Sequence, residues 1–82
     1  MNYIQEGNLI IYKFKDSCFL ANVLMVETKL IAIDIERIYG DMSLSQEWEI
    51  ETILKNKNSS VEIVEIFKDD NDLYDKYPEF SI

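Results

Sequence analysis

Residues 9–26, with the sequence LIIYKFKDSCFLANVLMV, decide the fold. Over residues 9–15, apolar and basic side chains alternate, which is typical of a β-strand that is buried on one face. The face expected to point inward holds Ile10, Tyr12 and Phe14. The opposite face holds Lys13 and Lys15, so we expect it to be solvated.

A second strand is predicted directly after the first. Asp16-Ser17 predicts a turn, because short polar side chains hydrogen-bond their own backbone there. Residues 18–26 then form a nearly continuous apolar run that only Asn22 interrupts. Such a run is typical of a central strand that is buried on both faces.

A third strand is predicted over residues 29–38, after a short connection at Glu27-Thr28. Alternation in this strand predicts an inward face of Ile31, Ile33 and Ile35 and an outward face of Asp34 and Glu36. Three consecutive strands with tight links form a meander, and Gly40-Asp41 is expected to end it.

The stretch 43–56 allows two interpretations. Ser43 with Gln46 matches a capping box, which favours a helix, but the apolar residues do not share one helical stripe. With a period of two, glutamates line one face, and Trp48, Ile50, Thr52 and Leu54 line the other. We therefore expect a fourth strand and keep the helix as the alternative.

The last third of the chain predicts a hairpin loop at 56–60, a β-branched strand at 61–67 and a short acidic helical turn that stops before Pro78. Four apolar side chains would hold this tail against the barrel: Leu73, Tyr74, Tyr77 and Phe80. The predicted fold is all-β, a small five-stranded SH3-like or OB-like barrel made of a meander plus a hairpin. The alternative is α+β, with residues 43–56 helical on a four-stranded antiparallel sheet.

Length and composition set the broad class of protein. The 82 residues predict a single domain over 1–82, and a hydrophobic content of 48% predicts that it folds. We expect no membrane span and no signal peptide, because the chain has no long apolar window and its first residues lack a basic region before an apolar run. A cytoplasmic location, in a bacterium or in the host cell of a phage, is the expectation.

The inventory of chemically active residues is small. The chain has no histidine, so Ser-His-Asp and Cys-His systems cannot form, and Cys18 lies in an apolar run that favours a core position. The run Asp69-Asp70-Asn71-Asp72 lacks the glycine and the spacing of a calcium loop. We therefore expect no enzyme, no catalytic residue, no metal ion and no cofactor.

The charge is unevenly distributed along the chain. Of 16 acidic residues, 11 lie in residues 41–82 together with only four basic ones, and the net charge is −8. Such a surface repels nucleic acid and anionic membranes and attracts basic proteins. The sequence predicts an inhibitor of a basic partner, plausibly a nuclease, in the manner of a phage anti-defence (anti-CRISPR-like) or toxin-immunity protein, with nucleic-acid mimicry as its sharpest form.

The partner-binding residues expected on this basis are nine acidic and three aromatic side chains. The acids are Glu47, Glu49, Glu51, Glu62, Glu65, Asp69, Asp70, Asp72 and Asp75, and the aromatic anchors are Trp48, Tyr74 and Tyr77. The alternative function is a small structural or adapter barrel that joins an assembly through an edge strand or its C-terminal tail, and a homo-oligomer fits that alternative.

Overall fold

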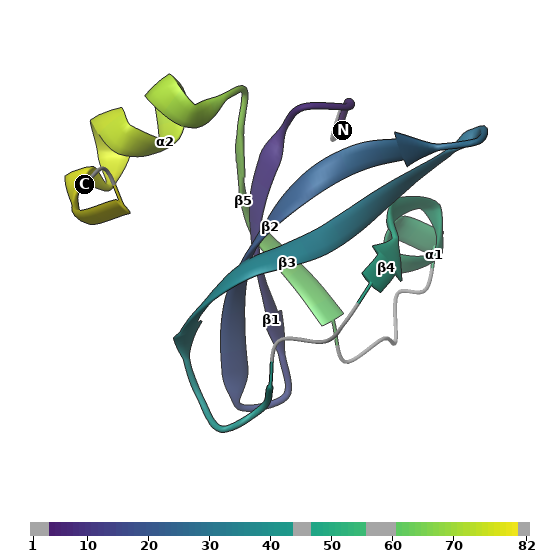
Figure 1. The fold of residues 1–82 in the computed structure, drawn as a ribbon. Helices are drawn as coiled ribbons and strands as arrows, with labels where there is room; N and C mark the ends of the chain where they lie inside the picture. The colour runs from purple at the N-terminus through teal and green to yellow at the C-terminus, as the bar shows by residue number, and fades with distance from the viewer. Residues whose placement is uncertain (1–3, 44–46, 56–60, 81–82) are drawn as a thin grey trace.

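The computed structural model describes residues 4–43, 47–55 and 61–80 (Figure 1). Two sequence predictions, the loop at 56–60 and the capping role of Gln46, lie outside these residues. The described part of the chain is mostly β-structure arranged as one antiparallel sheet, so the predicted all-β class is confirmed.

Five strands form this sheet in the order β4-β3-β2-β1-β5. Their bounds are β1 Leu9–Phe14, β2 Ser17–Val26, β3 Lys29–Tyr39, β4 Glu47–Glu49 and β5 Val61–Phe67. The first three strands make the predicted meander, and β5 returns to pair antiparallel with β1. β4 and β5 are the two ends of the strand order, and in the described residues the sheet is not closed into a barrel.

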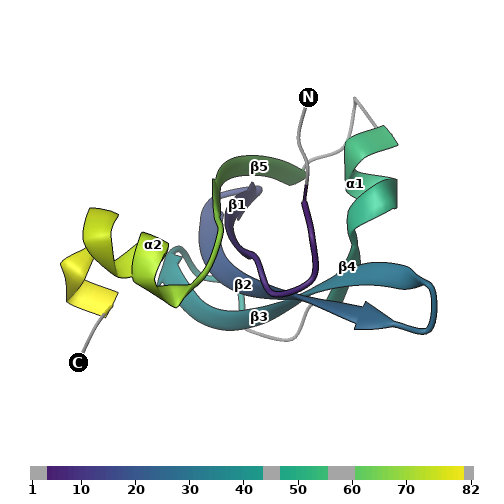
Figure 2. The same cartoon turned by 90° about the horizontal axis from the view of Figure 1, so that it is seen from above.

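Two short helices and a 3-10 turn complete the fold. These are α1 Ile50–Lys55, α2 Asp70–Lys76 and η1 Pro78–Phe80. The predicted tail is confirmed, because α2 ends before Pro78 and its apolar side chains pack on the sheet. Figures 1 and 2 show α2 and α1 at opposite ends of the molecule.

The two hairpins of the meander have two-residue turns. Phe14 pairs with Ser17, and Val26 pairs with Lys29, so the turns are Lys15-Asp16 and Glu27-Thr28. Lys15 and Glu27 have φ of 56° and 59°, the left-handed conformation that suits a tight hairpin. The first turn therefore lies one residue earlier than predicted, and Ser17 already belongs to β2.

Apolar side chains cover both faces of the sheet. A main core fills one face and consists of Ile4, Ile10, Tyr12, Phe19, Ala21, Val23, Ala32, Ile50, Ile53 and Val61. A second core on the other face consists of Leu9, Ile11, Cys18, Leu20, Phe67 and Leu73. Because β1 contributes to both cores, the prediction that it is buried on one face only is wrong for Leu9 and Ile11.

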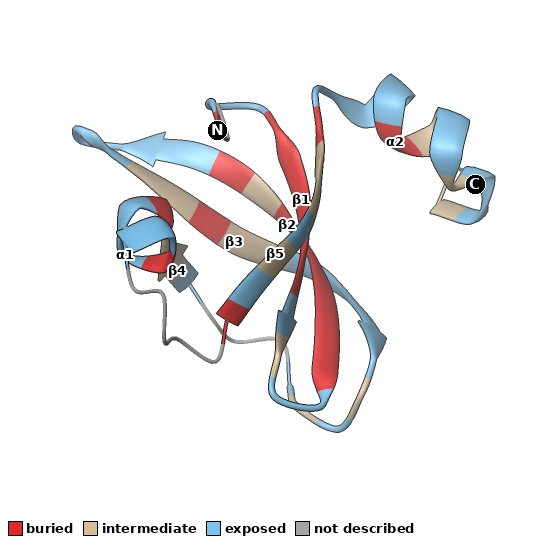
Figure 3. Ribbon diagram, turned by 180° about the vertical axis from the view of Figure 1, so that it is seen from behind, coloured by how far each residue is buried: buried red, intermediate tan, exposed pale blue. Residues whose placement is uncertain are grey.

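The predicted double burial of β2 holds for only part of the strand. Residues 17–21 and Val23 are buried, whereas Leu24, Met25 and Val26 are 37%, 45% and 50% exposed. Figure 3 shows this change from red to pale blue along β2, towards the tip of its hairpin with β3. The prediction fails there because the hairpin extends beyond the strands that cover the first half of β2 (Figure 2).

The predicted faces of β3 are wrong for Asp34 and Ile35, whereas Glu36 is exposed as predicted. Ala32 lies in the main core, and Asp34 points to the same side, where it accepts a hydrogen bond from the Tyr12 hydroxyl. Ile35, expected inside, is 51% exposed. Ala32 is the cross-strand partner of Trp48, so a small side chain leaves room for the indole, while the Tyr12 hydroxyl compensates the polar Asp34.

The stretch 43–56 combines both interpretations. Glu47–Glu49 pairs with Ile31–Ile33 as a short strand, and Ile50–Lys55 is a helix. The strand prediction is wrong beyond Glu49. The helical alternative is wrong for residues 47–49, which form a strand, and wrong in the number of strands, since the sheet has five. The reason is that Ile50 and Ile53, three residues apart, place both side chains in the main core only from a helix.

Candidate functional site

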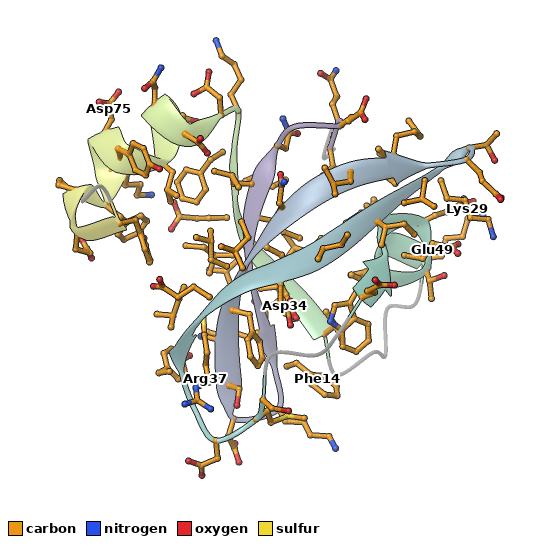
Figure 4. The ribbon with its side chains drawn as sticks, in the orientation of Figure 1. Phe14, Lys29, Asp34, Arg37, Glu49 and Asp75 are labelled. Atoms are coloured by element: carbon orange, nitrogen blue, oxygen red, sulfur yellow. The ribbon has the colours of Figure 1, made fainter. Side chains whose placement is uncertain are left out.

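Most of the acidic residues singled out from the sequence lie at two opposite ends of the molecule, and the other two lie on β5. Glu47 and Glu49 belong to β4 and Glu51 to α1, whereas the aspartates belong to the C-terminal arm, the name used below for residues 69–80. Figures 1 and 2 place these two ends apart, and Figure 4 shows Glu49 and Asp75 on opposite sides of the sheet. The sequence did not decide whether these acids share one face, and the structure shows that they do not form one continuous acidic face.

Lysines neutralise much of the charge at the β4 end. Lys29 Nζ lies 3.4 Å from a carboxylate oxygen of Glu49, and Lys55 Nζ lies 2.5 Å from one of Glu51. The hydrogen bond from Lys55 holds the pKa of the Glu51 carboxyl below its ordinary value. Glu51 lies on α1 and therefore does not continue the row of glutamates that was predicted on a strand. Only Glu47 and Glu49 share a strand.

The two glutamates on β5 have different environments. Glu62 is exposed opposite Lys13 of β1. Glu65 accepts hydrogen bonds from Lys76 Nζ and from the Tyr77 hydroxyl, each at 2.5 Å. These donors, Lys76 first, lower the pKa of the Glu65 carboxyl. Glu65 therefore fastens the C-terminal arm to the sheet and is not a free charge.

The aspartates of the C-terminal arm form a cluster of negative charge that is only weakly compensated, through the electrostatic interaction of Asp72 with Lys76. Asp69 is the N-cap of α2 and accepts a hydrogen bond from the Asp72 backbone N–H at 2.9 Å. Asp72 accepts one from the Lys68 backbone N–H at 3.0 Å. Asp70 and Asp75 are exposed, and within the described ranges none of these four aspartates forms an ion pair with a lysine or arginine. This end keeps a net negative surface.

The aromatic anchors expected from the sequence contribute mainly to the two cores. Trp48 packs against the main core, where its ring makes edge contacts with Phe14 at 5.1 Å and Tyr12 at 6.1 Å between centroids. Tyr74 and Tyr77 are half-buried against the second core. Most of the surface of Trp48 is therefore buried in the protein. Of the three anchors, only the two tyrosines lie close to the aspartates of the arm.

Sequence reasoning missed a polar network inside the main core. The Trp48 Nε1–H donates to the Tyr12 hydroxyl at 2.9 Å, and that hydroxyl donates to Asp34 Oδ1. Burial first, and then the hydrogen bond to Asp34, raise the pKa of the Tyr12 hydroxyl well above its ordinary range. The signal in the sequence was Asp34 itself, a carboxylate between the isoleucines of an apolar strand.

A set of exposed apolar residues was also missed. Ile35 and Ile38 on β3 and Val64 on β5 lie on the face of the second core, and each is more than a third exposed. Val64 has no partner in the pairing of β1 with β5, where the register shifts between Ile11 and Tyr12. The sequence prediction of a β-branched strand over residues 61–67 did not include such a bulge.

Three hollows are relevant to binding. The largest, the hairpin hollow, has about 460 Å³ and lies between the β2–β3 hairpin and α1, over Ile4, Leu30, Ile50 and Leu54. Two smaller hollows of about 210 Å³ and 130 Å³ lie between the sheet and the C-terminal arm, and Phe80 lines both. We call these two together the outer groove.

The candidate chemistry is limited in the part of the chain that the structure describes. No group of three or more Cys, Asp or Glu side chains there could hold a metal ion. The Cys18 thiol is buried, and burial raises its pKa, which disfavours the reactive thiolate. No described helix is both long enough and apolar enough to cross a membrane.

Neither a family model, nor a curated protein, nor a solved structure matches this chain.

Proposed function

We propose that this protein is a non-catalytic acidic binding protein that inhibits a basic, nucleic-acid-binding partner such as a nuclease. The proposal rests on a difference between the two ends of the molecule in how far their acidic side chains are paired with lysines. The acids of β4 and α1 are largely paired with lysines, whereas Asp69, Asp70, Asp72 and Asp75 are not. A cytoplasmic location belongs to the same proposal.

The mechanism is electrostatic attraction followed by local burial. Exposed carboxylates on one short helix produce a concentrated negative potential that steers a basic surface towards the C-terminal arm. Spaced along a helix, they stand in for the phosphates of a nucleic acid and so compete for the partner's own binding site. Tyr74 and Tyr77, half-buried beside them, supply aromatic contact area at the centre of the interface.

This activity suits an anti-defence protein of a phage, an anti-CRISPR-like inhibitor or a toxin-immunity protein. The proposed scaffold is an SH3-like half-open barrel. It fits better than the OB-like alternative because the strand order is a meander closed by β5 on β1, whereas an OB-fold is a Greek-key barrel. The arm then projects from one end of a rigid scaffold, which limits the entropy lost on binding.

The test is capture of the partner from a lysate of the native host or a competitor strain. We expect a basic protein that is retained at about 0.05 M salt and lost at about 0.5 M salt, because screening shortens the range of the attraction. The captured protein should be a nuclease or another nucleic-acid-binding protein whose activity this chain inhibits. Binding that does not depend on salt, or capture of no basic protein, would contradict the proposal.

A pair of charge-matched variants locates the interaction. D70N/D75N removes two carboxylates from the arm, and E27Q/E47Q removes two exposed carboxylates from the opposite half without breaking an ion pair of the described residues. We expect D70N/D75N to weaken partner binding by about tenfold and E27Q/E47Q to weaken it far less. Equal losses would show that only the overall charge matters.

A second candidate function is a small structural or adapter barrel. It is favoured by the outer edge of β5, a seven-residue strand that pairs only with β1 among the described strands. An added strand from another chain would extend the sheet there. A defined homo-oligomer in light scattering, together with no inhibition of a nuclease, would favour this function over the first.

A further inference from the structure

The outer groove is an apolar surface that the C-terminal arm covers only in part. Its floor comes from the second core, with Ile11, Cys18 and Leu20 of β1 and β2, and Phe80 of the arm lines both of its hollows. Ile35, Ile38 and Val64 line the hollows yet remain 51%, 37% and 43% exposed. Large apolar side chains gathered in one exposed concavity are typical of a binding surface.

The charged residues that line this groove are all acidic. Glu36 and Asp70 line the smaller hollow, and Glu65 and Glu79 line the larger one. No lysine or arginine is among the described residues that line either hollow, although Lys76 pairs with Glu65 and Lys13 is the cross-strand neighbour of Cys18. An apolar floor with an acidic rim is complementary to a ligand that is apolar on one side and cationic on the other.

The hairpin hollow, although larger, has no such preference. Lys29 and Lys55 line it together with Glu49 and Glu51, and these four residues are joined in two ion pairs. Its rim is therefore close to neutral, and nothing about its charge selects a partner. The two sites therefore differ in the charge of their rims, which is the property that would select a cationic ligand. This difference makes the hairpin hollow a matched control for the outer groove.

We propose that the outer groove binds a cationic amphipathic segment of the partner protein, with apolar side chains in the two hollows beside Phe80 and Lys or Arg side chains against Glu36, Asp70 and Glu79. The inference rests on the proposed function, because it names the part of a basic partner that is held. The arm thus acts twice: its aspartates attract the partner, and its inner side forms one wall of the groove.

Other occupants fit the charges less well. A second copy of this chain carries a net charge of −8 and would bring further acids to an acidic rim. An anionic membrane surface would be repelled in the same way. A cationic segment gains from both properties of the groove, since long Lys and Arg side chains pack their stems on apolar surface while their charged ends reach the carboxylates.

The test uses a synthetic peptide of about 14 residues in which Leu and Lys alternate at helical spacing, so that one side is apolar and the other cationic. Binding is followed by calorimetry and by methyl chemical shifts. We expect shifts at Ile35, Ile38 and Val64 in the outer groove and none at Leu54 in the hairpin hollow. The same peptide with Glu in place of Lys should not bind.

Two variants with unchanged charge complete the test. I38S/V64S makes the outer groove polar, and M25S/L54S changes two exposed apolar residues away from it, Met25 on β2 and Leu54 on α1. Fluorescence of Trp48, which packs against the main core, checks that both variants fold. We expect I38S/V64S to weaken peptide binding by about tenfold and M25S/L54S to leave it unchanged. Shifts centred on Leu54, equal losses in both variants, or a homodimer that occupies the groove would overturn the inference.

The captured partner separates this inference from the proposed function. If I38S/V64S loses the partner while M25S/L54S keeps it, the groove holds the partner as proposed. If D70N/D75N loses the partner but I38S/V64S keeps it, the inhibitor function stands and the groove inference falls. If no basic protein is captured while the peptide still shifts Ile38 and Val64, the function falls and the groove remains a cationic-peptide site.

Discussion

The indole Nε1–H of Trp48 donates a hydrogen bond of 2.9 Å to the hydroxyl of Tyr12, and the Tyr12 hydroxyl donates in turn to Asp34. The three residues come from β4, β1 and β3, so the network links an edge strand of only three residues to the centre of the sheet. Tyr12 is fully buried, and its hydroxyl therefore has no water to replace these partners.

Replacing Tyr12 by Phe should destabilise the protein by about 1–3 kcal/mol, because the change leaves both the Asp34 carboxylate and the Trp48 N–H with one partner fewer in a dry environment. Urea unfolding followed by the fluorescence of Trp48, the only tryptophan, measures the effect. Tyr74→Phe is the control, because no described residue hydrogen-bonds its hydroxyl. Equal unfolding midpoints for the two variants would show that the network adds nothing to stability.

Gly40 and Gly7 provide a second, internally matched prediction. Both have positive φ, 106° and 92°, so an Ala at either position is strained by about 1 kcal/mol or more. A Cβ on Gly40 would also lie 2.5 Å from Ser17 Cα, whereas one on Gly7 meets nothing within 4 Å. We expect Gly40→Ala to lose about 2 kcal/mol more than Gly7→Ala in thermal or urea unfolding. Similar losses would mean that the contact with Ser17 is relieved by a backbone shift.

The strands of the meander and the inward face of β1 could be predicted from the sequence, but the facing of β3 could not. In β3, Leu30, Ala32 and Asp34 alternate with Ile31, Ile33 and Ile35, and the isoleucines are the more hydrophobic set. Packing reverses that preference, because the side of Ala32 must also hold Tyr12, Phe19 and Trp48. When both faces of a sheet are covered by apolar side chains, the two faces of a strand no longer differ clearly in polarity. Alternation in the sequence then does not show which face points into the core.

The candidate site was predictable only in its charges. The acidic second half is plain in the sequence, yet the pairing of Lys29 with Glu49 and of Lys76 with Glu65 depends on contacts between strands and the arm. These pairs decide which acids remain free to attract a partner. The outer groove depends on β3, β5 and the arm together, and no local pattern in the sequence contains that combination.

Asp69 allows capping to be separated from charge in the C-terminal arm. Asp69→Ala removes the acceptor of the Asp72 N–H and should destabilise α2 by about 1 kcal/mol, whereas Asp69→Ser keeps a capping oxygen and should cost only a few tenths. Amide hydrogen exchange in α2 measures the difference. If Asp69→Ser retains helix protection but binds the basic partner more weakly, the carboxylate acts by its charge. Equal exchange in both variants would contradict a capping role.

Glu65 makes the docking of the C-terminal arm sensitive to acid. Hydrogen bonds from Lys76 and Tyr77 lower the folded-state pKa of Glu65 below the unfolded value of about 4.5. A carboxyl group with a lowered pKa stabilises the docked arm above the unfolded pKa, and the contribution is lost as the pH falls through the folded pKa. We therefore expect the protection of α2 amides from hydrogen exchange to fall below about pH 4.5, while the main core stays protected.

Glu65→Gln should remove this pH dependence, because the amide can accept a hydrogen bond from Tyr77 but carries no titratable charge. In this variant the α2 amides should exchange faster than in the wild type at neutral pH and show no further step in acid. Glu62→Gln, an exposed position on the same strand, is the control and should keep the wild-type acid step. An acid step of the same size in Glu65→Gln would assign the transition to the aspartates of the arm, and the Glu65 contact would then not be what holds α2 against the sheet.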